Sequence, residues 1–481
     1  MRRTERQLLF TIGIAAAIFA AKGLRGQALV WQQLYDAGQG AFYQGDLAKA
    51  ESQWVEAFGE AKRIGVQSPQ FLATQRSLAS LFLLWWRLDE ARAWLAATEK
   101  TMKERGQDAG ADLDVRLMAG QVNTAVSDLG EAARDLGTAL KLSEKLGNDH
   151  PSTAAVLLAL GELRFQQDAL AESAEHLRRA AGIYRETFGP IHPGTVEARS
   201  RLSQVLLVLG QYPEAADQAR LAAEAAEKLG AAGRIVRGDA LLAWALADAS
   251  IGRQQDASAK LVSALNQATA TYGEQSLRIV PYLTASAELA LSLGDTSKAA
   301  DFIARALSVC KSDALPDWLP MADALRVASK IAIRQSKLKD AAAAIDQARA
   351  IAAKRLMPDS LLMADVLEIR GDMRLASREV EGADADYRQS LVIREKQLPK
   401  SHPAQARSIV NLARVFQFSG KPETADALYA RAIQMLESAW GTDSANLIPT
   451  LESYVSCLRL QKRDSEAQAA EKRIEQLRAR H

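Results

Sequence analysis

The chain has 481 residues, of which 48% are hydrophobic, and its formal net charge is +2. Residues 1–28 hold five basic residues and one acidic residue, a net charge of +4, which leaves 2 − 4 = −2 for the rest. Phosphate binding needs a concentrated basic face, so this balance argues against nucleic acid as a partner.

The first 28 residues read as a targeting segment. A basic head, residues 1–7, precedes an uncharged apolar run, residues 8–21, which is shorter than the about 20 residues of a membrane-spanning helix and fits a signal-peptide core. A small-x-small site at Gly26–Ala28 predicts cleavage after Ala28, while Lys22 and Arg25 just before it keep an uncleaved anchor open. An ordinary buried first helix and an organelle transit sequence would also fit this composition.

We therefore expect residues 1–28 to be a signal peptide or an N-terminal membrane anchor, with possible membrane contact through residues 8–21. The expected location is the periplasm, or the inner membrane with the repeats facing the periplasm. A membrane tether on the cytoplasmic side is the rival, because the positive charges on both sides of the apolar run weaken the orientation signal.

Aromatic residues are concentrated in the next stretch, since five of the eight tryptophans fall within the first 94 residues. Residues 78–86 are apolar nearly all round, which predicts a helix buried on every side. This aromatic set is either the packed end of a helical stack or a docking patch for a bilayer interface or a protein. The candidate patch residues are Trp31, Tyr35, Phe42, Tyr43, Trp85 and Trp86.

The stretch from Ser408 to Gly441 predicts two antiparallel helices joined by a turn at residues 419–422. Small residues stand where the two helices would approach closely. The position of Ala425 recurs at intervals of 41 and then 42 residues, at Ala50, Ala91, Ala132, Ser173, Ala215, Ala257, Ala299, Ala341, Ala383, Ala425 and Ala467. A fixed period with small residues in register predicts a helical solenoid, against the alternative of chance periodicity in an alanine-rich chain.

Two further signals keep the same register. Turn glycines stand five residues before the first small position, at Gly45, Gly210, Gly252, Gly294 and Gly420. His150-Pro151, His192-Pro193 and His402-Pro403 are separated by one and by five periods. Proline is well placed at a helix start and holds the preceding residue extended, so these pairs predict helix starts more than metal ligands.

The unit resembles a tetratricopeptide repeat, on the pattern Leu412-Ala413, Gly420, Ala425, Tyr429 and Ala432. The period near 42, longer than the usual 34, is similar to that of the kinesin light chain variant. The resemblance covers residues 29–481 and implies an all-α, right-handed superhelical solenoid of about eleven helix-turn-helix repeats. The polar residues 465–481 predict a capping last helix.

Such a solenoid presents a groove lined by the first helix of each pair. Counting from the small residue of that helix, the residues three before and one after should face the groove. In repeats eight to eleven they are Arg326 and Lys330, Glu368 and Asp372, Val410 and Arg414, and Glu452 and Ser456. Their alternating sign predicts either ion pairs that hold neighbouring repeats together or a binding groove of mixed charge.

The kinesin light chain resemblance implies a peptide-holding asparagine two residues before that small position. Asn411 occupies the position, but the equivalent residues elsewhere are not asparagine, so the asparagine ladder is absent and a kinesin-type role is not supported.

No phosphate loop, GxSxG elbow, HExxH or GxGxxG motif is present, and no Cys/His cluster indicates a metal or another cofactor. Cys310 and Cys457 fall four repeats apart, too far for a disulfide. We therefore expect no enzyme and no cofactor, but a scaffold or adaptor that binds protein partners of unknown identity. The rival hypotheses are a small-molecule or glycan sensor using the groove, with Tyr35, Phe42 and Tyr43 as its aromatic set, and a membrane-tethered intracellular adaptor.

Overall fold

The computed structural model describes residues 26–108, 110, 112–312 and 318–480. The described residues form helices and the turns between them, with no strand among them, which confirms the all-α prediction. The chain divides into two compact units, residues 1–125 with 130–148 and residues 126–129 with 149–481. The predicted targeting run, residues 8–21, lies outside the described residues.

The first unit holds three helix pairs. Residues 26–43 pair with α2 (Leu47–Ile64), α3 (Pro69–Leu84) pairs with α4 (Leu88–Glu104), and α5 (Leu113–Ala125) pairs with α6 (Leu129–Glu144).

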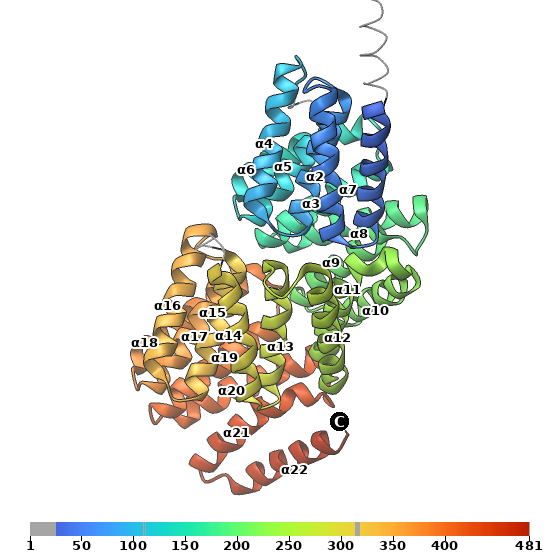
Figure 1. Ribbon diagram of the computed structural model, residues 1–481. Helices are drawn as coiled ribbons and strands as arrows, with labels where there is room; N and C mark the ends of the chain where they lie inside the picture. The colour runs from blue at the N-terminus through green and yellow to red at the C-terminus, as the bar shows by residue number, and fades with distance from the viewer. Residues whose placement is uncertain (1–25, 109, 111, 313–317, 481) are drawn as a thin grey trace, which may run out of the picture. The chain divides into compact units, whose positions relative to one another are not determined.

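The second unit holds eight pairs, which run from α7 and α8 to the red last pair in Figure 1. The pairs are α7 (Pro151–Gln166) with α8 (Leu170–Phe188), α9 (Pro193–Val208) with α10 (Tyr212–Lys228), α11 (Arg234–Ser250) with α12 (Gln254–Tyr272), α13 (Val280–Ser292) with α14 (Thr296–Ser312), α15 (Leu319–Arg334) with α16 (Leu338–Arg355), α17 (Leu361–Ala376) with α18 (Val380–Gln397), α19 (Pro403–Phe418) with α20 (Pro422–Trp440), and α21 (Ile448–Leu460) with α22 (Asp464–Arg480). Short 3-10 turns, η2 (Gly230–Gly233), η3 (Leu277–Ile279) and η4 (Ala445–Leu447), precede α11, α13 and α21.

The predicted small positions form the contacts between the two helices of each pair and between neighbouring pairs. The whole first series, from Ala50 to Ala467, is at most 1% exposed. The position seven residues later in the same helix, held by Ala432 in the tenth repeat, is equally buried at Ala57, Thr98, Ala139, Ala180, Ala222, Ala264, Ala306, Ala348, Ser390 and Ala432. The 42-residue register predicted from the sequence is therefore the packing register of the fold.

In several pairs, glycine stands where the first helix lies closest to a bulky side chain of the second. A Cβ added to Gly371 would lie 2.6 Å from the ring of Tyr387, which is fully buried. Gly120 and Gly161 meet Leu136 and Leu177 in the same way. These contacts show why the sequence places small residues at this position.

The turn inside each pair contains one residue with left-handed φ, five residues before the first small position. Glycine occupies it in the five repeats where the sequence shows a turn glycine. Other residues adopt φ between 57° and 65° at the equivalent positions, Trp86, Ser127, Asp168, Ser336, Arg378 and Lys462. The geometry of the helix pair imposes this conformation even on side chains that disfavour it.

The three His-Pro pairs start helices, as predicted. Proline is the first helical residue of α7, α9 and α19, and the preceding histidine is extended. Each imidazole Nδ1 accepts a hydrogen bond from the backbone N–H two residues on, at 3.1 to 3.2 Å, and thereby caps the helix.

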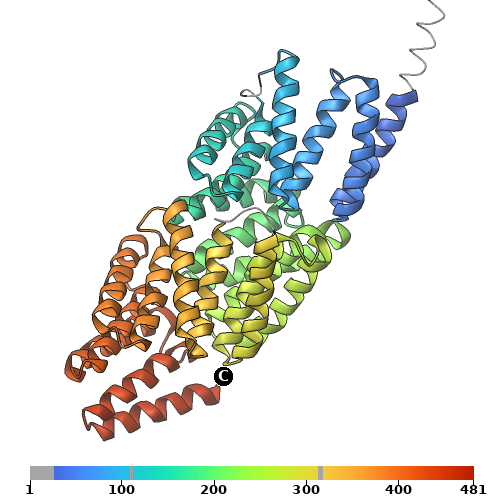
Figure 2. The same ribbon diagram turned by 60° about the vertical axis from the view of Figure 1, so that its left-hand side comes forward.

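The last pair ends the stack in both views (Figures 1 and 2). Of the described side chains of α22, only Ala467, Ile474 and Leu477 are buried, and most of the others are polar or charged. Helix α22 therefore has the character of the predicted cap. Cys310 and Cys457 are both free and buried, as expected for core thiols.

Candidate functional site

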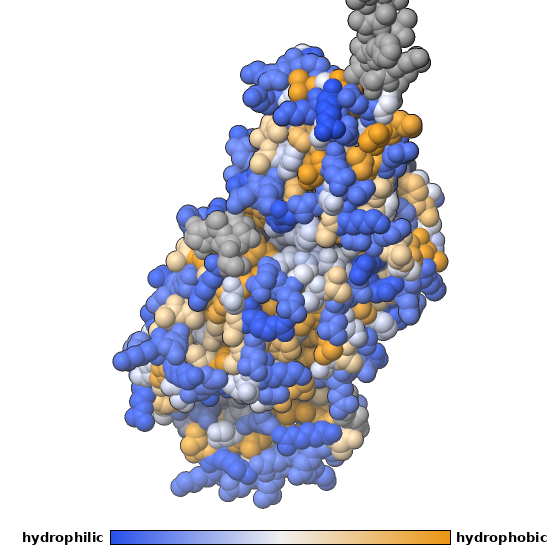
Figure 3. Space-filling model, viewed as in Figure 1, coloured by the Kyte–Doolittle hydropathy of each residue, from blue (hydrophilic) through white to orange (hydrophobic). Residues whose placement is uncertain are grey.

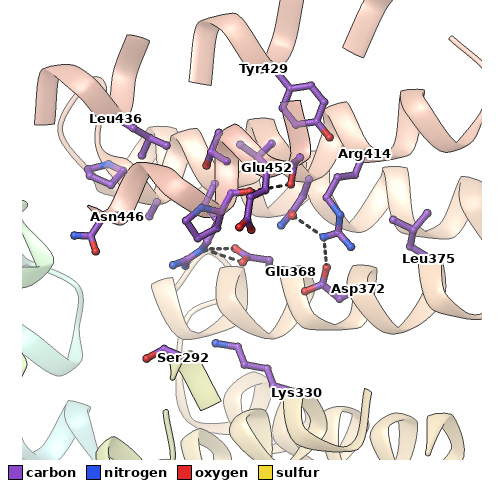
Figure 4. A pocket seen from close by; sticks show the side chains of 18 of the residues that line it. Ser292, Lys330, Glu368, Asp372, Leu375, Arg414, Tyr429, Leu436, Asn446 and Glu452 are labelled. Carbon is purple, nitrogen blue, oxygen red and sulfur yellow. Dashed lines mark hydrogen bonds and ion pairs between the residues drawn. The ribbon is translucent and has the colours of Figure 1, made fainter. Parts of the chain in front are cut away.

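A groove of about 1470 Å³ runs along the second unit. Its lining residues come mainly from the first helices of repeats seven to eleven, α13, α15, α17, α19 and α21, with Tyr212 and the end of α20 completing it. In Figure 4, Lys330, Glu368 and Asp372 extend into this space from neighbouring helices.

The residues predicted to face the groove line it, with one exception. Lys330, Glu368, Asp372, Val410, Arg414, Glu452 and Ser456 are lining residues, as is Asn411. Arg326 is not among the lining residues; its side chain is 9% exposed and pairs with Glu288, which lines the groove.

Glu288 of α13 pairs with the cations of the next repeat. Its Oε1 lies 2.7 Å from Arg326 Nη2 and 3.6 Å from Lys330 Nζ. Burial alone would raise the pKa of Glu288, but the two cations outweigh it and lower the pKa to about 2. Burial and the charge of Arg326 lower the pKa of Lys330. Ion pairs between neighbouring repeats, one of the two predicted roles, are thus present.

The most buried cation of the site is Arg394 of α18, whose side chain is 1% exposed. Its guanidinium pairs with Asp365 at 2.5 Å and with Glu368, and it donates to Ser408 Oγ at 2.7 Å. Arg407 of α19 pairs with the same Glu368 at 2.8 Å. Burial raises the pKa of Glu368, but Arg394 and Arg407 outweigh it, and the net shift is downward.

We call this row of ion pairs between neighbouring repeats the charged ladder. Its next member is Asp372 of α17. It accepts from Arg414 Nη1 at 2.9 Å and from the hydroxyl of Tyr387 at 2.8 Å. Arg414 also donates to Asn411 Oδ1 at 3.1 Å, and Asn411 is 5% exposed. The oxygen of the single asparagine at the kinesin-type position therefore holds an arginine of its own chain.

The charges of the groove lining balance. The cations are Lys330, Arg334, Arg407 and Arg414, and the anions are Glu288, Glu368, Asp372 and Glu452. Most of them are bound in ion pairs within the protein. Such a lining has no excess of one sign with which to attract a polyanion.

Apolar side chains form one edge of the groove. Leu291, Ile333 and Leu375 recur at intervals of 42 residues near the ends of α13, α15 and α17. Phe418 and Leu460, again 42 residues apart, are 54% and 60% exposed. Elsewhere on the second unit, hydrophobic side chains are visible between hydrophilic ones on the face shown in Figure 3. This edge can bind an apolar group from a partner.

The candidate aromatic patch lies in the first unit and packs largely against itself. Trp31 is 8% exposed and stacks on Tyr35 with ring centroids 4.8 Å apart, and the Tyr35 hydroxyl hydrogen-bonds Ser77 Oγ at 2.9 Å. Phe42 and Tyr35 both contact Trp54. Tyr43 is 61% exposed, and Trp85 and Trp86 are half-buried at the turn before α4.

These ring contacts are the ones expected if the aromatic residues form the packed end of a helical stack. Figure 3 shows hydrophobic side chains gathered over the first unit near the start of the described chain. The role of the patch as a docking surface remains a prediction.

Among the described residues, no group of three or more His, Cys, Asp or Glu side chains is placed to hold a metal ion. The same residues include no helix that is both long and apolar enough to span a bilayer.

Comparison with known families identifies the repeat. The profile of the tetratricopeptide repeat matches residues 159–228, which extend from the second half of α7 to the end of α10. The chain is built from tetratricopeptide-like repeats. A search of curated proteins finds no match for the sequence.

Solved structures with the same architecture include a Rap protein complexed with competence and sporulation factor, at 17% identity, covering 76% of this chain and 98% of that chain with a TM-score of 0.57. The apo form of the quorum sensor NprR from B. thuringiensis is 14% identical, covering 75% and 97% with a TM-score of 0.49. A putative kinesin light chain from Podosopora anserina with TPR-like repeats is 17% identical, covering 42% and 96% with a TM-score of 0.34. At 17% identity, the similarity to the Rap protein concerns the fold alone.

Proposed function

We propose that the protein is a non-catalytic scaffold whose second unit binds a segment of a partner protein in the groove. The observation that carries this proposal is the groove itself, with its internally paired charges and its exposed edge at Phe418 and Leu460. The tetratricopeptide-like fold supports it, since stacked repeats present extended concave binding surfaces.

The size and chemistry of the groove favour a protein segment over a small molecule. Its volume of about 1470 Å³ exceeds the about 300–1,000 Å³ that is usual for small-molecule pockets. The two exposed apolar residues suit side-chain anchors, and the balanced charges suit polar neighbours of both signs. We infer that the bound segment carries apolar anchors flanked by polar residues.

We also propose that the protein is exported to the periplasm or anchored in the inner membrane facing it. The support is the basic head and apolar run of residues 1–21. A cysteine placed at Met357, which is 71% exposed, tests this location. Labelling by a membrane-impermeant maleimide in cells whose outer membrane has been permeabilised is expected, and labelling only after lysis would support the cytoplasmic tether instead.

Position-specific photo-cross-linking tests the binding proposal. A photoreactive phenylalanine analogue replaces Phe418 in the groove or, as the control, Val392 of α18, which is 63% exposed and is not a groove residue. We expect a protein adduct from position 418 and not from position 392 in cells of the native host. Mass spectrometry of the adduct identifies the partner and the mature N-terminus. Equal adducts from both positions would contradict a groove-specific partner.

A further inference from the structure

The second unit contacts itself across about five repeats. The turns after α7, α9 and α11 contact the starts of α17, α19 and α21, and we call these three contacts the seam. Each step joins the turn inside one pair to the beginning of a pair five repeats further along the chain. Nothing in the repeat pattern requires such contacts, because each repeat of a solenoid normally touches only its neighbours.

At the first step of the seam, Asp168 caps a helix of another repeat. Its Oδ2 accepts a hydrogen bond of 2.8 Å from the N–H of Leu361, which is the first residue of α17. The two residues are 193 apart in the sequence. A carboxylate at a helix N-terminus is stabilised by the free N–H groups there.

At the second step, His402 lies against Gly210. A Cβ on Gly210 would stand 3.0 Å from Cδ2 and 3.2 Å from Nε2 of the imidazole. Apolar side chains surround this step, where Leu398, Leu361 and Ala404 pack with Leu170, Leu202 and Leu206. The separation of residues 210 and 402 is 192, nearly that of the first step.

At the third step, Asn446 of η4 donates from Nδ2 to the carbonyl of Ser250 at 2.8 Å, across 196 residues. A Cβ on Gly252 would lie 3.9 Å from the Cβ of Ala445, 193 residues away. Because three successive repeats make the same contact in the same register, the seam follows from the superhelical path of this unit and is not an isolated contact.

The seam and the groove share residues. Tyr212, His402, Ala404, Trp440 and Asn446 line the groove and also lie at the seam, where the rings of Tyr212 and Trp440 are 6.5 Å apart. A segment that occupies this end of the groove therefore competes with the seam for the same side chains.

The seam is also incompletely bonded. His402 Nε2 and Trp440 Nε1 are buried and make no hydrogen bond of normal geometry within the described residues, although the carbonyl of Val208 and the hydroxyl of Tyr212 lie close to them. Since His402 Nδ1 accepts from the N–H of Ala404, a neutral ring carries its proton on Nε2. Two buried donors without well-aligned acceptors weaken the closed arrangement, and carbonyl groups of a bound segment are suitable acceptors for both.

We propose that the seam is a reversible closure of the groove, which holds the free second unit closed and parts when a protein segment enters. This inference rests on the proposed function, because it describes the regulation of the same groove. Closing the seam permanently must weaken binding of the segment, and loosening the seam must strengthen it.

A reversible cross-link tests the coupling. The double substitution Gly252→Cys and Ala445→Cys places two Cβ atoms about 3.9 Å apart, within the range of about 3.5–4.5 Å for disulfides. The probe is a 12-residue peptide selected from a random phage-displayed library on the unsubstituted chain and shown to lose binding on Phe418→Asp. We expect the oxidised double variant to bind it at least about tenfold more weakly than the same protein after reduction. The single variant Gly252→Cys, which shares the backbone strain, should show no redox effect.

Equal or tighter binding by the oxidised protein would overturn the proposal, and so would a folded double variant that forms no disulfide. If no peptide is ever selected, the proposed function fails, and the coupling that depends on it fails with it.

A second measurement needs no ligand. Asp168→Ala combined with Asn446→Ala removes two seam hydrogen bonds, and hydrogen exchange followed by mass spectrometry should show exchange about tenfold faster at residues 358–364. Ser336→Ala is the matched control, because Ser336 occupies the same left-handed turn position as Asp168 outside the seam. Unchanged exchange in the double variant would show that these contacts do not hold the groove closed. This measurement requires no binding partner, so it tests the seam separately from the proposed function.

Discussion

Replacing Arg394 by methionine should destabilise the second unit strongly. The substitution keeps an unbranched, mostly apolar stem but removes a guanidinium that is 1% exposed and pairs with Asp365 and Glu368. It also removes donors to Ser408 Oγ and to the carbonyl of Ala404, at 2.7 and 3.1 Å. Removing one partner of a buried ion pair costs about 3–5 kcal/mol, because the other charge stays buried without compensation.

The expected loss lies at the lower end of that range, at about 3 kcal/mol, since Arg407 still pairs with Glu368 at 2.8 Å. Urea unfolding followed by circular dichroism measures it, with limited proteolysis to show whether repeats eight to ten unfold separately. The control is Arg388→Met, which removes an exposed pair with Asp384 and should cost less than about 1 kcal/mol.

The double variant Arg394→Met with Glu368→Gln should recover part of the loss, since it removes the stranded charge. If Arg394→Met lowers the free energy of unfolding no more than Arg388→Met does, the charged ladder does not stabilise the packing of the repeats. That result would refute the reasoning.

Three further substitutions test the packing of the repeats and the charge at the seam. Arg378→Gly relieves a left-handed residue (φ 65°) and should stabilise by about 0.5–1 kcal/mol in urea unfolding, whereas no gain would show that the turn is unstrained. Gly371→Ala should destabilise the protein by about 1–3 kcal/mol, because its Cβ would overlap the buried Tyr387 ring. Gly182→Ala should not destabilise it, because a Cβ there meets nothing within 4 Å. Equal effects would contradict the close approach of Gly371 to the Tyr387 ring. Burial, with a smaller effect of neighbouring carboxylates, raises the pKa of Asp168 to about 6. Its protonation should therefore raise the stability of the protein as pH falls from about 7 to 4, and Asp168→Asn should abolish that rise in a profile of melting temperature against pH. A profile unchanged by the substitution would contradict the raised pKa.

The repeat architecture was predictable because it depends on local packing. Ala425 and Ala432 recur wherever two helices must touch, so the sequence pattern carries the packing register directly. The turns were only partly predictable. Gly420 is a residue type that favours left-handed φ, so the sequence indicates this conformation there. Arg378 adopts the same conformation because the helices on both sides impose it, and no backbone preference of arginine indicates that.

The charged ladder was predictable where its residues follow the register. Glu288 stands one residue after Ala287, the small position of repeat seven, so the rule used for Lys330 would have found it had it been extended by one repeat. Asp365 and Arg407 share another register position, 42 residues apart, which also gave a usable signal. Arg394 belongs to the second helix of its pair and contacts Asp365 and Glu368 of α17 from there, and no periodic feature indicates its role.

The seam was not predictable from one sequence. Its contacts join residues about 193 apart, and their register depends on the small rotation between successive repeats, added over five of them. Asp168 and Asn446 read as ordinary turn residues in the sequence. Only the path of the superhelix brings them to Leu361 and Ser250.

The most direct test of the account is the affinity of the cross-linked partner segment for two matched variants. Phe418→Asp places a charge on the exposed edge of the groove, and Val392→Asp places the same charge on a site outside it that is at least as exposed. Isothermal titration should show affinity for the segment at least about tenfold lower for Phe418→Asp and unchanged for Val392→Asp, as expected for loss of a buried apolar anchor. Equal affinities for both variants would contradict the claim that the groove is the binding site.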